Sequence, residues 1–209
     1  MAQDDQELSI IFRSFHVRTI GEMLKKLEWE ISRLKVDMLS ELPYSATALR
    51  ASSYGAINAA ITAFHISDWI WAISSDKQKA LWIKDVPGGK DKKAQKLRFQ
   101  IMLKNECPAF QICRGIANSA KHLVDDKYPE PVRNGKTQNL PVPARAGALR
   151  AGEPLMKYSV ELTTILGGSD GDGGVPHRAI DVFTKAYEFF DSFCLEHGLL
   201  EDIVLDTPH

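Results

Sequence analysis

The chain has 209 residues, of which 44% are hydrophobic and 25% are charged, and its formal net charge is −1. These values are ordinary for a soluble globular protein, and the length suits a single domain over residues 1–209 with a real core. The acidic first residues lack the basic region of a signal peptide, and three cysteines without metal-site spacing are typical of reduced thiols. The N-terminal residues and the cysteines together argue against a secreted, disulfide-stabilised protein, and we expect a cytoplasmic protein.

The charge is distributed unevenly along the chain. Residues 77–150 contain 16 lysines and arginines against 6 aspartates and glutamates, whereas the remaining residues contain 10 against 21. The basic residues are densest in "DKQKALWIKDVPGGKDKKAQKLRF", residues 76–99. A basic face of this kind would attract the phosphate backbone of RNA or another polyanion. A solvated connection between helices, balanced by the acidic remainder, is the alternative interpretation.

The first predicted helix covers residues 19–39. Thr19 and Glu22 have the spacing of a capping box, which marks a helix N-terminus. Large apolar residues then recur at helical intervals from Ile20 to Met38. The pattern predicts an amphipathic helix with one face in the core.

The second predicted helix, residues 46–75, is the longest and is rich in alanine and large apolar residues. Its length would suffice for a transmembrane span. Polar residues interrupt it too often for that, among them Asn58, Thr62, His65 and Asp68. We therefore expect a central helix that is buried on most sides, and no contact with a membrane.

Three shorter helices and a strand follow in the predicted order. The helices cover residues 76–84, 93–106 and 108–124, the last beginning at a proline, which suits the first turn of a helix. Apolar and polar residues alternate in 155–166, which predicts a half-buried strand. The final helix is predicted over 176–198 and ends at a glycine.

The predicted fold class is mainly α. We expect an antiparallel helical bundle whose core is formed by residues 19–124 and 176–198. A loop and β insertion over residues 125–175, containing a small β-hairpin, precedes the last helix.

Two polar stripes are candidates for a functional site, and the first lies on the central helix. His65 and Asp68 share a narrow face with Tyr54 and Asn58, opposite a side of small residues. A buried carboxylate without a partner costs several kcal/mol, so Asp68 must be paired, hydrogen-bonded or protonated.

The second stripe lies on helix 108–124. Arg114, Asn118, Lys121 and His122 gather opposite the apolar face of that helix. Arg114 and His122 lie two turns apart, roughly 12 Å along the axis, so His122 with Asn118 or Lys121 is the better working set. If the two stripes line one cleft, His65 or His122 would serve as general acid or base, Asp68 would orient the imidazole, and Arg114 or Lys121 would hold an anion.

Other interpretations of these residues remain open. The second stripe also fits a solvated helix face, and His65 with Asp68 also fits a pair that only fixes helix packing. His65, Asp68 and His122 form a set of two histidines and one carboxylate, which is a known metal-ligand combination. The sequence contains no glycine-rich phosphate loop and no nucleophile elbow, and we expect no cofactor.

The segments "AFHISDWIW" (63–71) and "CRGIANSAKHL" (113–123), set among these helices, resemble the HEPN-type helical proteins of bacteria and phages. The resemblance covers residues 19–124 and the last helix. Many members are uncharacterised, and others are toxin or defence ribonucleases. In those ribonucleases an arginine, a polar residue and a histidine share one helix, and two copies form the active cleft. Here seven residues separate Arg114 from His122, where the family has four to six, and a glycine follows the arginine.

The resemblance implies a homodimer that binds RNA and cleaves it without a metal ion, with His122 as the residue that transfers most directly. A non-catalytic assembly or regulatory protein is the first alternative. A metal-dependent hydrolase that uses His65, Asp68 and His122 is the second.

Overall fold

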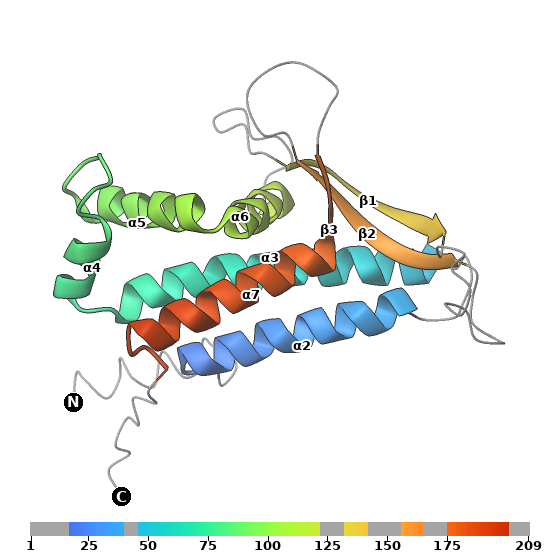
Figure 1. Ribbon diagram of the computed structural model, residues 1–209, viewed down its shortest axis with the longest axis horizontal. Helices are drawn as coiled ribbons and strands as arrows, with labels where there is room; N and C mark the ends of the chain where they lie inside the picture. Colours follow the sequence, from blue (N-terminus) through green and yellow to red (C-terminus); the bar gives the residue numbers. More distant parts are fainter. Residues whose placement is uncertain (1–16, 40–45, 122–131, 142–155, 165–174, 201–209) are drawn as a thin grey trace, which may run out of the picture.

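The computed structural model describes residues 17–39, 46–121, 132–141, 156–164 and 175–200, and over these residues it is mainly helical (Figure 1). The helices are α2 (Ile20–Leu39), α3 (Ala46–Ile73), α4 (Asp76–Trp82), α5 (Lys92–Glu106), α6 (Pro108–Lys121) and α7 (Ala179–Glu196). The strands are β1 (Val132–Pro141), β2 (Met156–Thr164) and β3 (Val175–Arg178).

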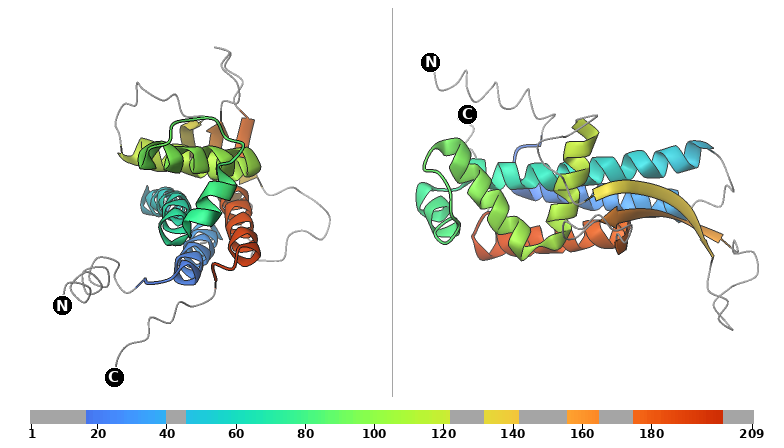
Figure 2. Two further views of the ribbon diagram at one scale, coloured as in Figure 1. Left: turned by 90° about the vertical axis from the view of Figure 1, so that its left-hand side faces the viewer. Right: turned by 90° about the horizontal axis from the view of Figure 1, so that it is seen from above.

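The helices form two layers. The three long helices α2, α3 and α7 lie side by side, and α5 and α6 lie across one face of them (Figures 1 and 2). The short helix α4 stands at one end of the molecule, and the strands lie toward the other end (Figure 1).

The start of α2 has the predicted capping box. The Glu22 N–H donates to the Thr19 hydroxyl oxygen, and the Thr19 N–H donates to the Glu22 carboxylate, each at 3.1 Å. These bonds satisfy N–H groups that have no partner within the helix. The core face is also as predicted, because all six apolar residues of the helical pattern are buried: Ile20, Leu24, Leu27, Ile31, Leu34 and Met38.

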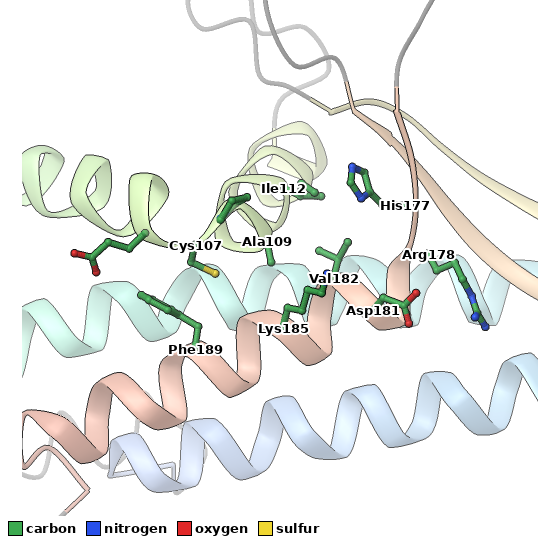
Figure 3. Close-up of a pocket in the computed structure, with 11 residues that line it drawn as sticks. Cys107, Ala109, Ile112, His177, Arg178, Asp181, Val182, Lys185 and Phe189 are labelled. Atoms are coloured by element: carbon green, nitrogen blue, oxygen red, sulfur yellow. The ribbon is translucent and has the colours of Figure 1, made fainter.

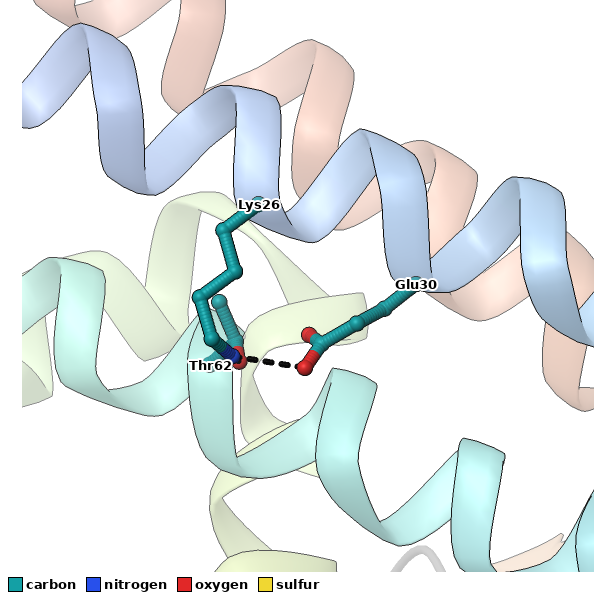
Figure 4. Close-up of polar contacts among 3 residues, drawn as sticks. All are labelled: Lys26, Glu30 and Thr62. Carbon is teal, nitrogen blue, oxygen red and sulfur yellow. Dashed lines mark hydrogen bonds and ion pairs between the residues drawn. The ribbon is translucent and has the colours of Figure 1, made fainter. Parts of the chain in front are cut away.

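The helix α3 folds back along α2 and packs through its small side chains. Ala59, Ala60 and Ala63 are fully buried, and such side chains let neighbouring helices approach closely. The Lys26 ammonium group binds the carboxylate of Glu30, which is also on α2, and the hydroxyl of Thr62 on α3 (Figure 4). None of the helices in the described ranges is long and apolar enough to cross a membrane.

An aromatic cluster holds α4, α5 and α7 together at one end of the molecule. The Trp82 ring centroid lies 5.2 Å from those of both Phe99 and Phe193 and 5.1 Å from that of His197. Phe99 is fully buried, and Trp82 and Phe193 are nearly so. Burial of such large side chains contributes about 2–3 kcal/mol each before losses of entropy are counted.

The three strands form a sheet in the order β1-β2-β3, with antiparallel pairing between neighbours. The strand β2 lies within the segment 155–166, where apolar and polar residues alternate. The predicted start of the last helix is wrong: the helix begins at Ala179, and the residues before it belong to β3. The cause is pairing with β2, since His177 lies opposite Leu162 and Arg178 opposite Glu161.

Candidate functional site

Asp68 has an ion-pair partner, but this partner lies on a different helix from the one expected. Its carboxylate lies 2.9 Å from the Lys96 ammonium group and accepts a hydrogen bond of 3.2 Å from the Gln100 side-chain amide. Both partners belong to α5, whereas the single-cleft hypothesis places Asp68 opposite α6. The expectation of a buried carboxylate is also wrong, because 31% of the Asp68 side chain is exposed.

The rest of the α3 stripe lies at the surface. His65, Asn58 and Tyr54 are exposed, so the expectation that α3 is buried on most sides must be corrected. The helix packs through its alanine side, and the stripe lies opposite that side. Phe64 of α3 contacts α6, since its ring centroid lies 6.4 Å from that of Phe110.

The α6 stripe is described only in part. Arg114 and Asn118 are half-buried and each has an interaction partner. Lys121 is the last residue of α6, and His122 lies outside the described residues. The hypothesis that the two stripes share one cleft therefore stays a prediction. The role of His122 stays a prediction, and so does the metal set that includes it.

The apolar side of α6 is as predicted near its start. Ile112, Cys113 and Ile116 are buried, whereas Ala120 is exposed. All three cysteines of the chain are free and buried. Burial raises the pKa of the Cys113 thiol far above its ordinary value, and the neighbouring Cys107 adds to this effect. A thiol held neutral in this way is inert packing.

The basic residues of α4, α5 and their connecting loop form a defined surface, here called the basic hairpin (residues 76–106). Lys84, Lys90, Lys92 and Lys93 are exposed, and no ion pair engages them within the described part of the chain. Lys77 is exposed as well, whereas some of the other basic residues of this hairpin make contacts within the protein. Arg98, for example, donates to the backbone carbonyls of Ile83 and Val86, and Lys96 pairs with Asp68, so neither of them adds to the exposed lysine surface.

A cavity of about 620 Å³ lies between the start of α6 and the β3–α7 junction (Figure 3). We call it the α6–α7 cavity. Its apolar wall is formed by Cys107, Ala109, Ile112, Val182 and Phe189. Ionisable groups stand around it, namely Glu106, His177, Arg178, Asp181 and Lys185.

The ionisable groups of the α6–α7 cavity point in different directions. Lys185 runs along Val182 toward α6, and His177 enters from β3, whereas Arg178 and Asp181 point away from α6 (Figure 3). Among the residues described, no ion pair engages Lys185. The Lys185 ammonium group, which has no ion pair among the described residues, therefore lies beside the apolar wall of the cavity.

Sequence reasoning missed this cavity because its residues are distant in the chain. The start of α6 and the start of α7 are about seventy residues apart, and neither segment carries a motif. The local signal is a basic pair, His177 and Arg178, at the start of the last predicted helix, and such a pair does not by itself predict a cavity.

Within the described ranges, no three histidine, cysteine, aspartate or glutamate side chains are placed to hold a metal ion. No protein-family model, no curated protein and no solved structure matches this chain. The lysines of the basic hairpin are therefore the main indication of a function among the described residues.

Proposed function

We propose that this chain is a HEPN-like antiparallel helical bundle that binds RNA as a polyanion through the basic hairpin. The observation that supports this most directly is the group of four exposed lysines, Lys84, Lys90, Lys92 and Lys93, without ion-pair partners among the described residues. Each lysine that contacts a phosphate releases condensed counterions, which is a large favourable term in nucleic-acid binding.

The hairpin is ordered before any ligand binds. Asp91 caps α5 by accepting hydrogen bonds of 3.0 Å from the N–H groups of Lys93 and Ala94. Arg98 fixes the loop through the carbonyls of Ile83 and Val86. A surface that is already ordered loses less conformational entropy on binding.

The test compares two double variants that remove the same charge from different surfaces. Lys92→Gln/Lys93→Gln alters the basic hairpin, and Lys25→Gln/Lys35→Gln alters exposed lysines of α2. Binding of a labelled single-stranded RNA is measured by fluorescence anisotropy. At about 0.1 M salt we expect the hairpin variant to bind ~20-fold more weakly, from two lost phosphate contacts. The α2 variant should bind like the wild type, and equal losses in both variants would contradict the proposal.

The resemblance adds a catalytic form of the proposal, in which two copies cleave RNA without a metal ion. His122 acts as general acid or base, Asn118 and Lys121 position the RNA, and Arg114 holds a phosphate. In the presence of a chelator, the wild type should cleave RNA and His122→Ala should not. Light scattering should give a mass twice the 23.3 kDa of one chain. Absence of cleavage in the wild type, or equal cleavage by His122→Ala, would rule out this form.

A second candidate is a non-catalytic assembly or regulatory role, and the contacts of Asp68 favour it. An aspartate held by Lys96 and Gln100 fixes α3 against α5, and this needs no reaction to explain it. RNA binding without cleavage in the same assay would support this candidate over the catalytic form.

A further inference from the structure

We infer that the α6–α7 cavity binds a small organic anion, with an acidic head group beside Lys185 and an apolar body against the α6 side. Apart from Glu106, no residue named in its lining belongs to the basic hairpin, and the inference does not depend on RNA binding. Its volume of about 620 Å³ falls within the range of about 300–1,000 Å³ that is usual for small-molecule sites.

The lining of the cavity requires a ligand with two kinds of surface. Ala109, Ile112 and Val182 are buried apolar residues, and Phe189 is a half-buried aromatic residue of the lining. Cys107 belongs to this wall because burial raises the pKa of its thiol and keeps it neutral. An apolar wall with a few polar groups at one side is the usual construction of a site that orients an amphipathic molecule.

The sign of the charge follows from the groups that face the cavity. The Lys185 ammonium and the His177 ring lie on the side toward α6 (Figure 3). Arg178 and Asp181 carry opposite charges and both point away from α6, so their effects largely cancel (Figure 3). Glu106 and Lys185 are both exposed residues of the lining, so solvent screens both charges, and Lys185 is the one seen beside the apolar wall, along Val182 (Figure 3).

Two helix N-termini lie at the cavity wall, and the C-terminal end of α5, with the opposite partial charge, lies there too at Glu106. Both α6, which begins at Pro108, and α7, which begins at Ala179, start at the cavity wall. The N-terminal end of a helix carries a partial positive charge that favours anions. Asp181 offsets this charge in the first turn of α7, but the first turn of α6 contains no acidic residue.

Calorimetric titration of the full chain with three probes of equal chain length tests the inference. Hexanoate and hexyl phosphate each have an acidic head group and an apolar body, and hexanol has only the body. We expect at least one of the two acids to bind about tenfold more tightly than hexanol, because a charged hydrogen bond is lost in the alcohol. The tighter acid identifies the head group. Equal binding of all three probes, or no binding by any of them, would overturn the inference.

Variants at Lys185 locate the binding to the cavity. Lys185→Gln should weaken the binding of the preferred acid about tenfold and leave hexanol unchanged, and Lys185→Arg should retain most of the affinity. Lys25→Gln, on the surface of α2, is the control and should bind like the wild type. If Lys185→Gln binds the acid as the wild type does, the proposed site is wrong. Thermal unfolding of each variant confirms that the fold is retained.

Discussion

Lys26, Glu30 and Thr62 form a partly buried polar contact between α2 and α3. The Lys26 ammonium lies 2.6 Å from one Glu30 oxygen and also binds the Thr62 hydroxyl (Figure 4). Only 9% of the Glu30 side chain is exposed, and its second carboxylate oxygen is buried without a hydrogen-bond partner among the described residues. Among the described residues, the Lys26 ammonium group is therefore the one group that compensates the negative charge of the buried Glu30 carboxylate.

Replacement of Lys26 by methionine should therefore destabilise the protein. Lys26→Met leaves a buried carboxylate unpaired, and we expect the free energy of unfolding to fall by about 1–2 kcal/mol, less than for a fully buried pair because Lys26 is half exposed. Denaturant unfolding measures this change. The double variant Lys26→Met/Glu30→Met removes both charges and should recover most of the loss.

The pair Arg33–Asp37 provides the control for this prediction. It has the same spacing on the same helix, at 3.1 Å, but 61% of the Arg33 side chain is exposed. Arg33→Met should change the free energy of unfolding by less than about 0.5 kcal/mol. A loss as large as that of Lys26→Met, or no recovery in the double variant, would show that the burial of Glu30 is not the cause.

The sequence predicted the helix face on which a residue lies better than it predicted which residues that side chain contacts. Asp68 does have an ion-pair partner, as expected, although the burial on which that expectation rested is wrong. The identity of that partner depends on where α5 lies over α3, which helical spacing does not determine. The same limit applies to Lys26, whose position on α2 does not reveal that Thr62 lies opposite.

At the scale of the element, the basic hairpin depends on a close contact between Gly88 and Arg98. Gly88 has a φ of 153°, and a Cβ atom at this position would lie 2.9 Å from the Cγ and Cδ atoms of Arg98. The Arg98 side chain cannot move aside without losing its hydrogen bonds to Ile83 and Val86. The loop that presents the exposed lysines is therefore held by this pair.

Gly88→Ala should lower both stability and RNA affinity. We expect the free energy of unfolding to fall by about 1–3 kcal/mol because the backbone is strained and Arg98 is displaced. Gly55→Ala is the matched control, since an added Cβ would meet Leu34 at 3.5 Å, an ordinary contact, inside α3. That variant should gain about 0.5–1 kcal/mol and keep its RNA affinity. Denaturant unfolding and anisotropy measure the two quantities, and equal stability of the two variants would contradict the account.

The elements themselves were largely predictable where the signal is local. Capping at Thr19 and Glu22 and a proline at position 108 located the starts of α2 and α6. The start of α7 was not predictable in this way, because residues 175–178 extend the sheet by pairing with β2. Such pairing joins residues that are distant in the sequence, and no local propensity reports it.

At the scale of the whole molecule, the two proposed sites lie at different places. The exposed lysines of the basic hairpin lie toward the end of the molecule where α4 lies, and the α6–α7 cavity lies beside the end of β3 (Figures 1 and 3). The excess of basic residues in 77–150 could be counted from the sequence, but which lysines are exposed depends on the fold. The cavity could not be foreseen, since it forms only where α6 meets α7.

The salt dependence of RNA binding tests the central claim, that the basic hairpin contacts phosphates, most directly. The logarithm of the association constant should fall linearly with the logarithm of salt concentration for the wild type. Replacing Lys84, Lys90, Lys92 and Lys93 by glutamine should reduce the magnitude of the slope by about 3, because each phosphate contact on a single strand contributes about 0.7. An unchanged slope in this variant, or binding by the wild type that does not depend on salt, would contradict the claim.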